Sequence, residues 1–395
     1  MTDQPEVLSR RLLDDLARQG EITGSWAAAL HTVPRHHFIP DVIYRHERGR
    51  PGNDLVPLHR ADEPEHWLDL VYSDVPINTQ VDDGNPSMDG TGFEVTSSSS
   101  QPSVVAGMLA ELDAQPGERV LEIGTGTGWN AALLAHIVGA GNVTTIEIDP
   151  AVAAHARAAL DATGYGGVTV VVGDGAVGWP NGAPYDRVLS TVGVAAIPYA
   201  WVEQTKPGGR IVAPLTDSYR SPGVVMLTRH DDGTASGRLA GPAAFMALRG
   251  QREPRVRGAD FVDPPEVKAT TELHPHHLTA NRAAAVAIGL RVAGVCWSWQ
   301  SVGDLGTLWL YAPGSRSWAS LQVLEQPPYA VEQAGPRRLW DEVTDAYEWW
   351  LDAGEPGADA WLVTVDRHGQ QTLGRDGRPS CQGRTQPMIV VGSAR

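Results

Sequence analysis

Three glycines at single-residue spacing form the part of the sequence best suited to hold a small ligand. Gly124, Gly126 and Gly128 follow directly on an apolar run at residues 120–123, and a helix-like run at residues 130–138 comes after them. Glycine at such a strand-to-helix turn lets the backbone adopt positive φ and approach a ligand closely. The first amides of the following helix can also bind an anionic group. The sequence therefore predicts a ligand-binding turn at the carboxyl end of a strand.

The spacing around this turn separates two classes of ligand. A dinucleotide fingerprint needs glycine at position 129, where Trp129 stands. The observed G-x-G-x-G pattern, preceded by the acid Glu122, suits S-adenosylmethionine (SAM) better than NAD. Glu147 lies about 20 residues beyond the glycines, the offset at which a carboxylate accepts from ribose hydroxyls. Asp174, followed by Gly175, ends a third apolar run, and we expect it to accept from the adenine amine.

A run of serines supplies the second set of candidate residues. Ser98, Ser99 and Ser100 stand just before a predicted helix at residues 103–112 that leads into the glycine strand. A serine run is often a flexible linker, but this position lets the hydroxyls face a bound methyl donor. Hydroxyls orient a carboxylate without neutralising it as a strong cation would. Because a carboxylate with a pKa of about 3.9 is already ionised at neutral pH, it needs no general base, only positioning.

The elements that must position these residues alternate between strand and helix, which is typical of an open α/β sheet. A chain of 395 residues is too long for one ordinary core, so we expect several domains. Residues 1–95 are predicted to be an N-terminal helical segment with a long polar loop insertion at 41–95, on the substrate side. Residues 96–250 hold the ligand-binding motifs, and residues 251–395 read as a C-terminal α+β extension.

The C-terminal extension is predicted to begin with a linker and to contain a small α/β domain. Helices are expected at 279–290 and 336–351, and strands near 295–300, 307–312, 317–324 and 360–365. The second helix is predicted to carry Pro336 in its first turn. Eight of the 13 tryptophans lie in this extension, and core packing is favoured over a peptide groove for most of them. Trp349 falls on the polar face of its helix and is the best candidate for a peptide contact.

Charge and composition exclude several classes of partner. A formal net charge of −16 with no basic cluster argues against nucleic acid and anionic membranes. No apolar run is long enough to span a bilayer, and no signal peptide is recognised, so a cytoplasmic enzyme is expected. Cys296 and Cys381 cannot form a disulfide framework and lack metal-site spacing.

Three further polar clusters admit two interpretations each. The pair His36–His37 and the HPHH run at residues 274–277 contain metal-ligand types, but surface or loop positions are favoured and no metal is predicted. Asp82 and Asp83 could contact substrate, although a charged turn is favoured.

Several segments together resemble the protein L-isoaspartate O-methyltransferase family, in the family's own order. They are VPRHHFIP, SSSSQP, VLEIGTGTG, VVVGDGAVGW, APYDRVLSTVGVAAIP and QTKPGGRIVAPL, spread over roughly residues 7–40 and 70–250. The resemblance implies a class I SAM-methyltransferase Rossmann-like sheet of seven strands, with the cofactor above the first two strands. It implies SAM as methyl donor and S-adenosylhomocysteine as product.

The resemblance also assigns roles to individual positions. The residues on family cofactor positions are Gly124, Gly126, Glu147, Asp174 and Gly175. Ser100 falls on the serine that orients the substrate carboxylate, and Ser98 falls on the neighbouring threonine. Ser99 replaces the family's isoleucine, which would make the substrate wall more polar.

Two segments depart from the family and bear on the substrate. Residues 41–69 and 251–395 have no counterpart in the compact repair enzymes. The serine run with a long extension resembles an actinobacterial branch associated with ribosomally made, modified peptides, in lanthipeptide or ATP-grasp-ligated clusters. That resemblance implies methylation of an aspartate side chain in a modified precursor peptide, followed by loss of the ester to a succinimide and isoaspartate.

The first expectation is therefore a carboxyl O-methyltransferase that acts on a precursor peptide, with the C-terminal extension as a peptide-recognition domain. The alternatives are repair of isoaspartate in damaged proteins, a SAM-binding module without catalysis and, last, an NAD oxidoreductase. The sequence leaves the oligomeric state open.

Overall fold

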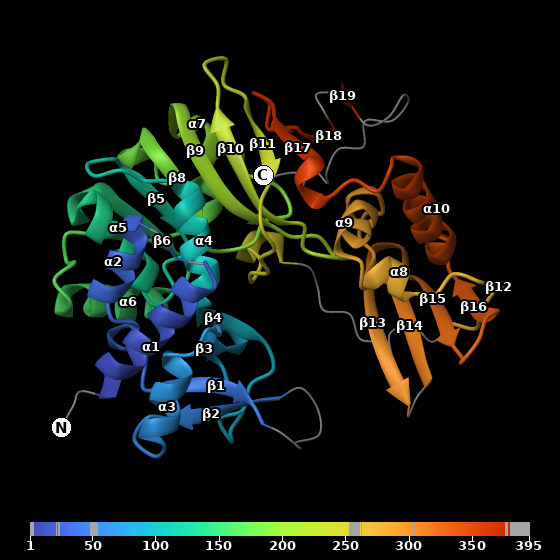
Figure 1. The fold of residues 1–395 in the computed structure, drawn as a ribbon, viewed down its shortest axis with the longest axis horizontal. Coiled ribbons are helices and arrows are strands. Elements are labelled where there is room, and N and C mark those ends of the chain that lie inside the picture. The colour runs from blue at the N-terminus through green and yellow to red at the C-terminus, as the bar shows by residue number, and fades with distance from the viewer. Residues whose placement is uncertain are drawn as a thin grey trace.

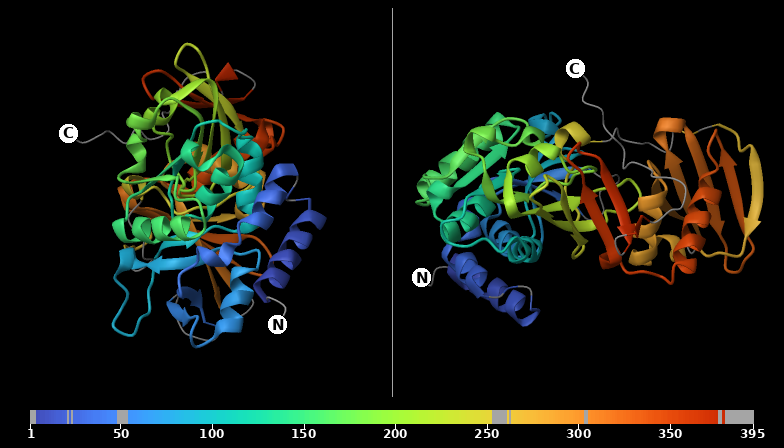
Figure 2. Two further views of the ribbon diagram at one scale, coloured as in Figure 1. Left: turned by 90° about the vertical axis from the view of Figure 1, so that its left-hand side faces the viewer. Right: turned by 90° about the horizontal axis from the view of Figure 1, so that it is seen from above.

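The computed structural model describes residues 4–20, 22, 24–47, 54–252, 261, 263–302, 305–375 and 378–379. Three sheets organise the fold, with four, ten and five strands (Figure 1). Seen from above, the five-stranded sheet lies at one end of the long axis, and the N-terminal helices and the α/β part of the ten-stranded sheet lie side by side at the other (Figure 2).

The N-terminal part is a small sheet flanked by helices. Its elements are α1 (Gln4–Arg18), α2 (Gly24–Thr32), η1 (Arg35–His37), β1 (Val42–His46), β2 (Leu55–His59), α3 (Pro64–Val71), β3 (Ile77–Val81), η2 (Asp82–Gly84) and β4 (Val95–Ser99). The strands run antiparallel in the order β2-β1-β3-β4. The long loop predicted for residues 41–95 is therefore wrong. Each strand has only five residues and most side chains of β1 and β3 are polar or half-buried, so no clear alternation marks them.

The central sheet contains the predicted α/β unit. Its strands are β5 (Val120–Ile123), β6 (Val143–Glu147), β7 (Thr169–Val172), β8 (Tyr185–Ser190), β9 (Thr205–Leu215), β10 (Gly223–Arg229) and β11 (Ala235–Leu239). The connecting helices include α4 (Pro102–Leu112), α5 (Trp129–Val138), α6 (Pro150–Ala162) and α7 (Tyr199–Glu203). Strands β5 to β9 are parallel in the order β7-β6-β5-β8-β9, and β10 and β11 add antiparallel strands. This confirms the predicted fold class.

The chain returns to the central sheet after the C-terminal domain. The strands β17 (Trp361–Val365), β18 (Gln371–Arg375) and β19 (Arg378–Pro379) extend the sheet beyond β11, so that it has ten strands and not seven. Figure 1 shows β17 and β18, in red, beside β11. The strand predicted at 360–365 is confirmed, but it belongs to the central sheet. Residues 251–395 are therefore not one separate unit.

The C-terminal sheet has helices on one face. Its strands are β12 (Val267–Thr271), β13 (Cys296–Val302), β14 (Leu305–Ala312), β15 (Ser317–Val323) and β16 (Tyr329–Ala334), and its helices are α8 (His276–Thr279), α9 (Arg282–Arg291) and α10 (Leu339–Asp352). The predicted central strands and both helices are confirmed, and β12 and β16 were not predicted. A continuous buried core links this domain to the central sheet through α9 and α10.

Two expectations for α10 are wrong. The helix begins at Leu339 and not at Pro336, because the Arg337 amide donates to Ser317 Oγ at 3.0 Å and holds the chain outside the helix. Trp349 does not present a free ring to a peptide. It stacks on Trp361 with ring centroids 5.5 Å apart, and the Arg291 guanidinium lies 5.0 Å from its ring centroid.

No helix among the described residues is long and apolar enough to cross a membrane.

Candidate active site

The glycine turn connects β5 to α5 as the sequence predicts. Gly124, Gly126 and Gly128 have φ values of +91°, +54° and +86°. A β-carbon on Gly124 would lie 2.7 Å from Thr191 Oγ1, and one on Gly126 would lie 3.2 Å from the Ser98 carbonyl oxygen. Left-handed φ and close approach both require glycine at these positions.

A pocket lies between this turn and the serine run. It encloses about 910 Å³, counting its open mouth. Its walls come from residues 96–100, 105, 123–127, 129–130, 146–148, 175, 191–192, 246–249 and 252. The turn and the serine run are therefore the two opposing walls of one site, which we call the glycine wall and the serine wall.

Glu147 stands at the carboxyl end of β6, inside this pocket. Its Oε2 accepts from the Gly126 amide at 3.0 Å and its Oε1 accepts from the Asp149 amide at 3.1 Å. Burial raises the pKa of Glu147, and the backbone donors oppose that shift. A half-buried carboxylate beside the glycine turn is well placed for ribose hydroxyls.

Glu122 lies beneath the turn and not on the pocket. It is fully buried, and its carboxylate accepts from Thr145 Oγ1 at 2.6 Å and from Asn130 Nδ2. Burial raises its pKa to about 7. Asn130 lines the pocket and Glu122 does not. The structure therefore places Glu122 not in the expected contact with a cofactor but beneath the glycine turn, where it holds Asn130.

Asp174 and Gly175 follow β7, and only Gly175 lines the pocket. The Asp174 carboxylate is exposed and accepts from the Ala176 amide at 2.9 Å, which caps η4 (Gly175–Val177). A β-carbon on Gly175 would lie 2.5 Å from an Ile123 methyl. The contact of Asp174 with adenine stays a prediction.

The serine run forms β4 and the residue after it, so its side chains alternate. Ser97 and Ser99 are buried and hydrogen-bonded: Ser97 Oγ accepts from Thr79 Oγ1 at 3.1 Å, and Ser99 Oγ accepts from the buried Arg35 Nε at 3.2 Å. Ser98 and Ser100 are half-buried, and within the described part of the chain their hydroxyls have no hydrogen-bond partner. Ser99 also borders the pocket, but its hydroxyl oxygen accepts from Arg35, so a more polar substrate wall at this position stays a prediction.

Arg35 is the site residue that the sequence analysis missed. It is only 2% exposed, and its guanidinium donates to the carbonyls of Ser99 at 3.0 Å and Ser100 at 2.8 Å. Burial lowers its pKa to about 9, which still leaves it cationic at neutral pH, with Asp74 as the largest opposing charge. The VPR motif contains this residue, but nothing local marks it as a partner of the serine run.

Ion pairs between distant segments complete the pocket rim. Asp83 pairs with Arg249 at 2.9 Å and with Arg252 at 3.4 Å, and both arginines line the pocket. Asp82 accepts from the amides of Phe93 and Glu94, which confirms the predicted charged turn. The arginines were not predicted.

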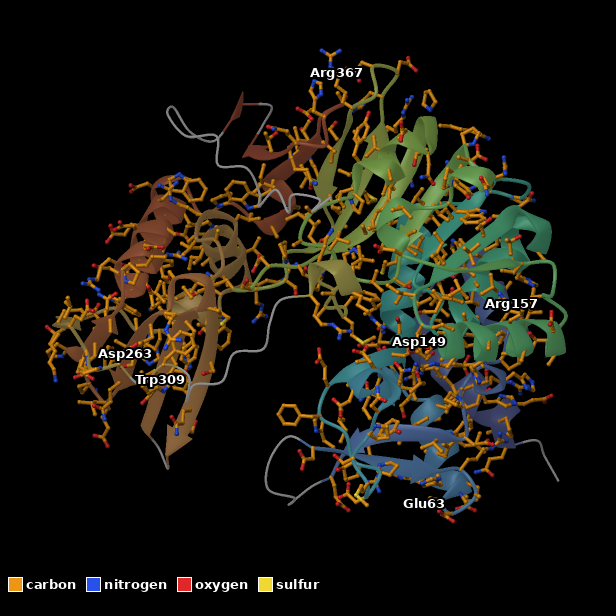
Figure 3. All side chains as sticks on the ribbon, turned by 180° about the vertical axis from the view of Figure 1, so that it is seen from behind. Glu63, Asp149, Arg157, Asp263, Trp309 and Arg367 are labelled. Carbon is orange, nitrogen blue, oxygen red and sulfur yellow. The ribbon has the colours of Figure 1, made fainter. Side chains whose placement is uncertain are left out.

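A second link joins the N-terminal sheet to the cofactor strand. Gln80 on β3 donates to the Asp149 carboxylate at 2.9 Å and accepts from Thr96 Oγ1 at 2.8 Å. Figure 3 shows Asp149 where the N-terminal sheet meets the central α/β layer. The serine wall is thus tied to the strand that ends in Glu147.

The histidine clusters make aromatic contacts. His274 packs edge-on against Tyr329, and His277 lies near Tyr347. Among the described residues no group of three or more His, Cys, Asp or Glu side chains is placed to hold a metal ion. Cys381 lies outside the described residues.

Comparison with known proteins agrees with this geometry. The family model of protein-L-isoaspartate(D-aspartate) O-methyltransferase (PCMT) matches residues 63–253. Protein-L-isoaspartate O-methyltransferase 2 of Archaeoglobus fulgidus is 34% identical over 242 residues, 61% of this chain and 92% of that protein. Protein-L-isoaspartate O-methyltransferase 2 of Polaromonas sp. is 42% identical over 225 residues, 57% of this chain and 88% of that protein.

A solved structure extends the similarity in fold beyond this region. A protein-L-isoaspartate O-methyltransferase aligns with a TM-score of 0.53 and 20% identity, and the alignment covers 93% of this chain and 99% of the chain of that structure. The fold of the C-terminal extension therefore has a counterpart in an enzyme of that name. The sequence relatives, the family match and the pocket agree: the chain belongs to the protein-L-isoaspartate O-methyltransferase family and is a SAM-dependent carboxyl O-methyltransferase.

Proposed function

We propose that the enzyme methylates the free α-carboxylate of L-isoaspartyl residues in proteins and peptides, as a repair-type methyltransferase. The observation that carries this proposal is the pairing of the two walls. Ser98 and Ser100 bring hydroxyls that have no hydrogen-bond partner among the described residues to the same pocket that Glu147 and the glycine turn line. The names of the sequence relatives support the same substrate class.

The residues present fit SAM as the methyl donor. Gly124 and Gly126 allow close approach to the turn, and Glu147 offers a carboxylate for the ribose. SAM supplies a methyl group activated on a sulfonium. The protein's contribution is to hold an ionised carboxylate in line with that methyl group, an effect of orientation that can contribute several kcal/mol.

The serine wall suits an ionised carboxylate. Donors from Ser100 and Ser98 hold its oxygens while leaving one lone pair for the new O–CH3 bond, which forms as the methyl–sulfur bond breaks. No proton moves in this step, since the carboxylate is ionised at neutral pH. The ester then reacts within the substrate: the following backbone amide nitrogen attacks, methanol leaves and a succinimide forms.

A modified precursor peptide remains the second candidate substrate. That interpretation depended on the C-terminal extension and on a more polar serine wall. The solved structure shares the fold over 93% of this chain, so the C-terminal extension no longer favours the precursor peptide. The recognition of peptides by the C-terminal sheet stays a proposal without a specific contact.

A matched set of peptides tests the proposed function. One sequence is synthesised with isoaspartate and with aspartate, and a ring-modified, ribosomally made peptide that contains aspartate forms a third substrate. Each is incubated with enzyme and SAM, and mass spectrometry with methanol release reports the ester. The proposal expects methylation of the isoaspartyl peptide alone. Methylation of the aspartyl or ring-modified peptide alone would support the second candidate, and SAM binding without any transfer would support a binding module.

A further inference from the structure

A buried arginine and a half-buried aspartate hold the serine wall from two sides. Arg35 lies in η1, far from the pocket in sequence, and within the described residues its guanidinium donates hydrogen bonds to neutral acceptors only. They are the carbonyls of Val71, Ser73, Val75, Ser99 and Ser100 and the Ser99 hydroxyl, at 2.8–3.4 Å. A buried cation without this hydrogen bonding would be strongly destabilising.

Among the described residues, the acceptors of Arg35 come from two segments. One is the last residue of α3 and the loop after it, from Val71 to Val75, and the other is the end of β4 with Ser100. A single planar guanidinium therefore sets the spacing between this loop and the serine wall. Lysine has fewer N–H donors, all on one nitrogen, so it cannot reproduce the planar arrangement of the guanidinium donors.

Asp74 belongs to the same loop and holds the next residues along the chain. Its Oδ2 accepts from Gln101 Nε2 at 3.0 Å, and its Oδ1 accepts from the Ser103 amide in the first turn of α4 at 2.9 Å. Asp74 also supplies the largest charge that opposes the desolvation of Arg35.

Ser100 lies between the backbone contacts made by Arg35 and those made by Asp74. Its carbonyl is held by Arg35, and the residues after it are held by Asp74. Its own hydroxyl is free within the described part of the chain and borders the pocket. The backbone that aims this hydroxyl is thus fixed on both sides.

We propose that Arg35 and Asp74 are positioning residues that set the aim of the Ser100 hydroxyl at the substrate carboxylate. The proposal rests on the proposed function, because it acts through Ser100. A small displacement of a positioned group lowers the rate of reaction by up to about 100-fold. Substitution of Arg35 or Asp74 should therefore lower turnover and leave SAM affinity unchanged.

The test combines Arg35→Lys with Ser100→Ala in a double-mutant cycle on an isoaspartyl peptide. Arg35→Lys is expected to slow single-turnover methyl transfer about 10- to 100-fold and to leave the SAM dissociation constant within about twofold. In the Ser100→Ala background the same change is expected to slow transfer by no more than about twofold, because the hydroxyl that it aims is gone.

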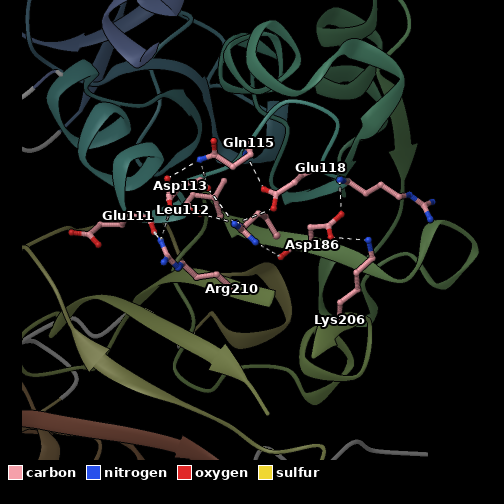
Figure 4. Close-up of polar contacts among 10 residues, drawn as sticks. Glu111, Leu112, Asp113, Gln115, Glu118, Asp186, Lys206 and Arg210 are labelled. Carbon is pink, nitrogen blue, oxygen red and sulfur yellow. Dashed lines mark hydrogen bonds and ion pairs between the residues drawn. The ribbon is translucent and has the colours of Figure 1, made fainter. Parts of the chain in front are cut away.

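Arg187→Lys provides a matched control. Arg187 also donates to backbone carbonyls, those of Leu112 at 3.0 Å and Asp113 at 3.2 Å. Leu112 and Asp113, labelled in Figure 4, stand at the far end of α4. We expect the turnover of the Arg187→Lys variant to stay within about twofold of that of the wild type. Equal losses in both lysine variants would make the effect one of general stability and overturn the proposal.

The outcomes separate this inference from the proposed function. If Ser100→Ala leaves turnover unchanged, the serine wall is not the substrate wall and the proposed function loses its support. If Ser100→Ala slows transfer but the losses multiply in the double variant, Arg35 acts independently and the inference is wrong. If Arg35→Lys does not fold, Asp74→Asn takes its place in the same cycle, with the same non-additive result expected.

Discussion

The two walls of the pocket are built in different ways. The glycine wall is held mainly within one stretch of chain: Thr145 bonds Glu122 across 23 residues and Gly126 bonds Glu147 across 21, while Thr191 adds one distant contact, to the Gly124 carbonyl 67 residues away. The serine wall bonds Gln80 and Thr79 of the neighbouring strand across 16 and 18 residues, but it also depends on Arg35, which lies 64 residues before Ser99, and Gln80 ties it to Asp149, 69 residues beyond Gln80. The cofactor side is therefore a local motif, whereas the substrate side depends on the assembled N-terminal sheet. Mutations in the glycine wall should lower SAM affinity, whereas mutations in the serine wall should lower the rate of methyl transfer.

The largest effect is expected where the walls touch, at Gly126. A β-carbon there would lie 3.2 Å from the Ser98 carbonyl, and φ is +54°. Gly126→Ala should therefore weaken SAM binding about 10-fold and turnover about 100-fold or more. Titration calorimetry and initial rates measure the two losses. Gly141→Ala, whose β-carbon meets nothing within 4 Å, is the control and should behave as wild type. Normal activity in Gly126→Ala would mean that the walls do not meet there.

Ser100→Ala tests the serine wall alone. It should lower turnover about 10- to 100-fold with SAM affinity within about twofold, because the hydroxyl is proposed to contact the substrate and not the cofactor. Ser97→Ala is the matched neighbour, since its hydroxyl faces Thr79, and should change turnover by less than about threefold. Equal loss of SAM affinity and turnover in Ser100→Ala would contradict the division between the walls.

Glu147→Gln tests the glycine wall alone. The amide keeps one acceptor oxygen, so one of the two backbone amides now bound by the carboxylate faces an NH2 group. SAM affinity should fall about 10-fold, while turnover at saturating SAM stays within about threefold. Calorimetry with SAM is the measurement, and exposed Glu203→Gln is the control. An unchanged dissociation constant would remove Glu147 from the cofactor site.

Glu122→Gln should have the smallest effect on catalysis and a distinct effect on stability. Burial raises the pKa of Glu122 from 4.5 to about 7. Between these values the folded protein keeps a proton that the unfolded chain has lost, so the free energy of unfolding falls as pH rises through this window. The variant should lose this dependence, on the order of 1–3 kcal/mol, between pH 5 and 8. Melting temperatures measure it, and parallel pH profiles for variant and wild type would speak against a raised pKa.

The same difference between the walls explains how much could be predicted from sequence. The glycine turn, Glu147 and the parallel strands follow from local pattern, and all lie where expected. Arg35, Arg249 and Arg252 were missed because their partners are distant in sequence. No local spacing relates an arginine in η1 to a hydroxyl on β4.

The missed elements share a physical cause as well. Strands β1 and β3 carry few buried side chains, and most of β12 is exposed, so hydrophobic alternation does not mark them. The residues of β17 do not themselves indicate that the strand belongs to the central sheet.

The return of the chain to the central sheet supports the site. Gln371 on β18 bonds both backbone groups of Ile197, in the loop after pocket residues Thr191 and Val192. A truncation at residue 251 would therefore remove part of the central sheet and this support, and it would not isolate peptide recognition.

The division between cofactor and substrate walls is tested most directly by single-turnover methyl transfer at saturating SAM, with an isoaspartyl peptide and isotopically labelled methyl donor. The rate is measured for wild type, Ser100→Ala and Glu147→Gln. We predict that Ser100→Ala slows transfer at least about 10-fold while Glu147→Gln stays within about threefold of wild type. Equal slowing in the two variants, or no transfer to the isoaspartyl peptide by the wild-type enzyme, would contradict the account.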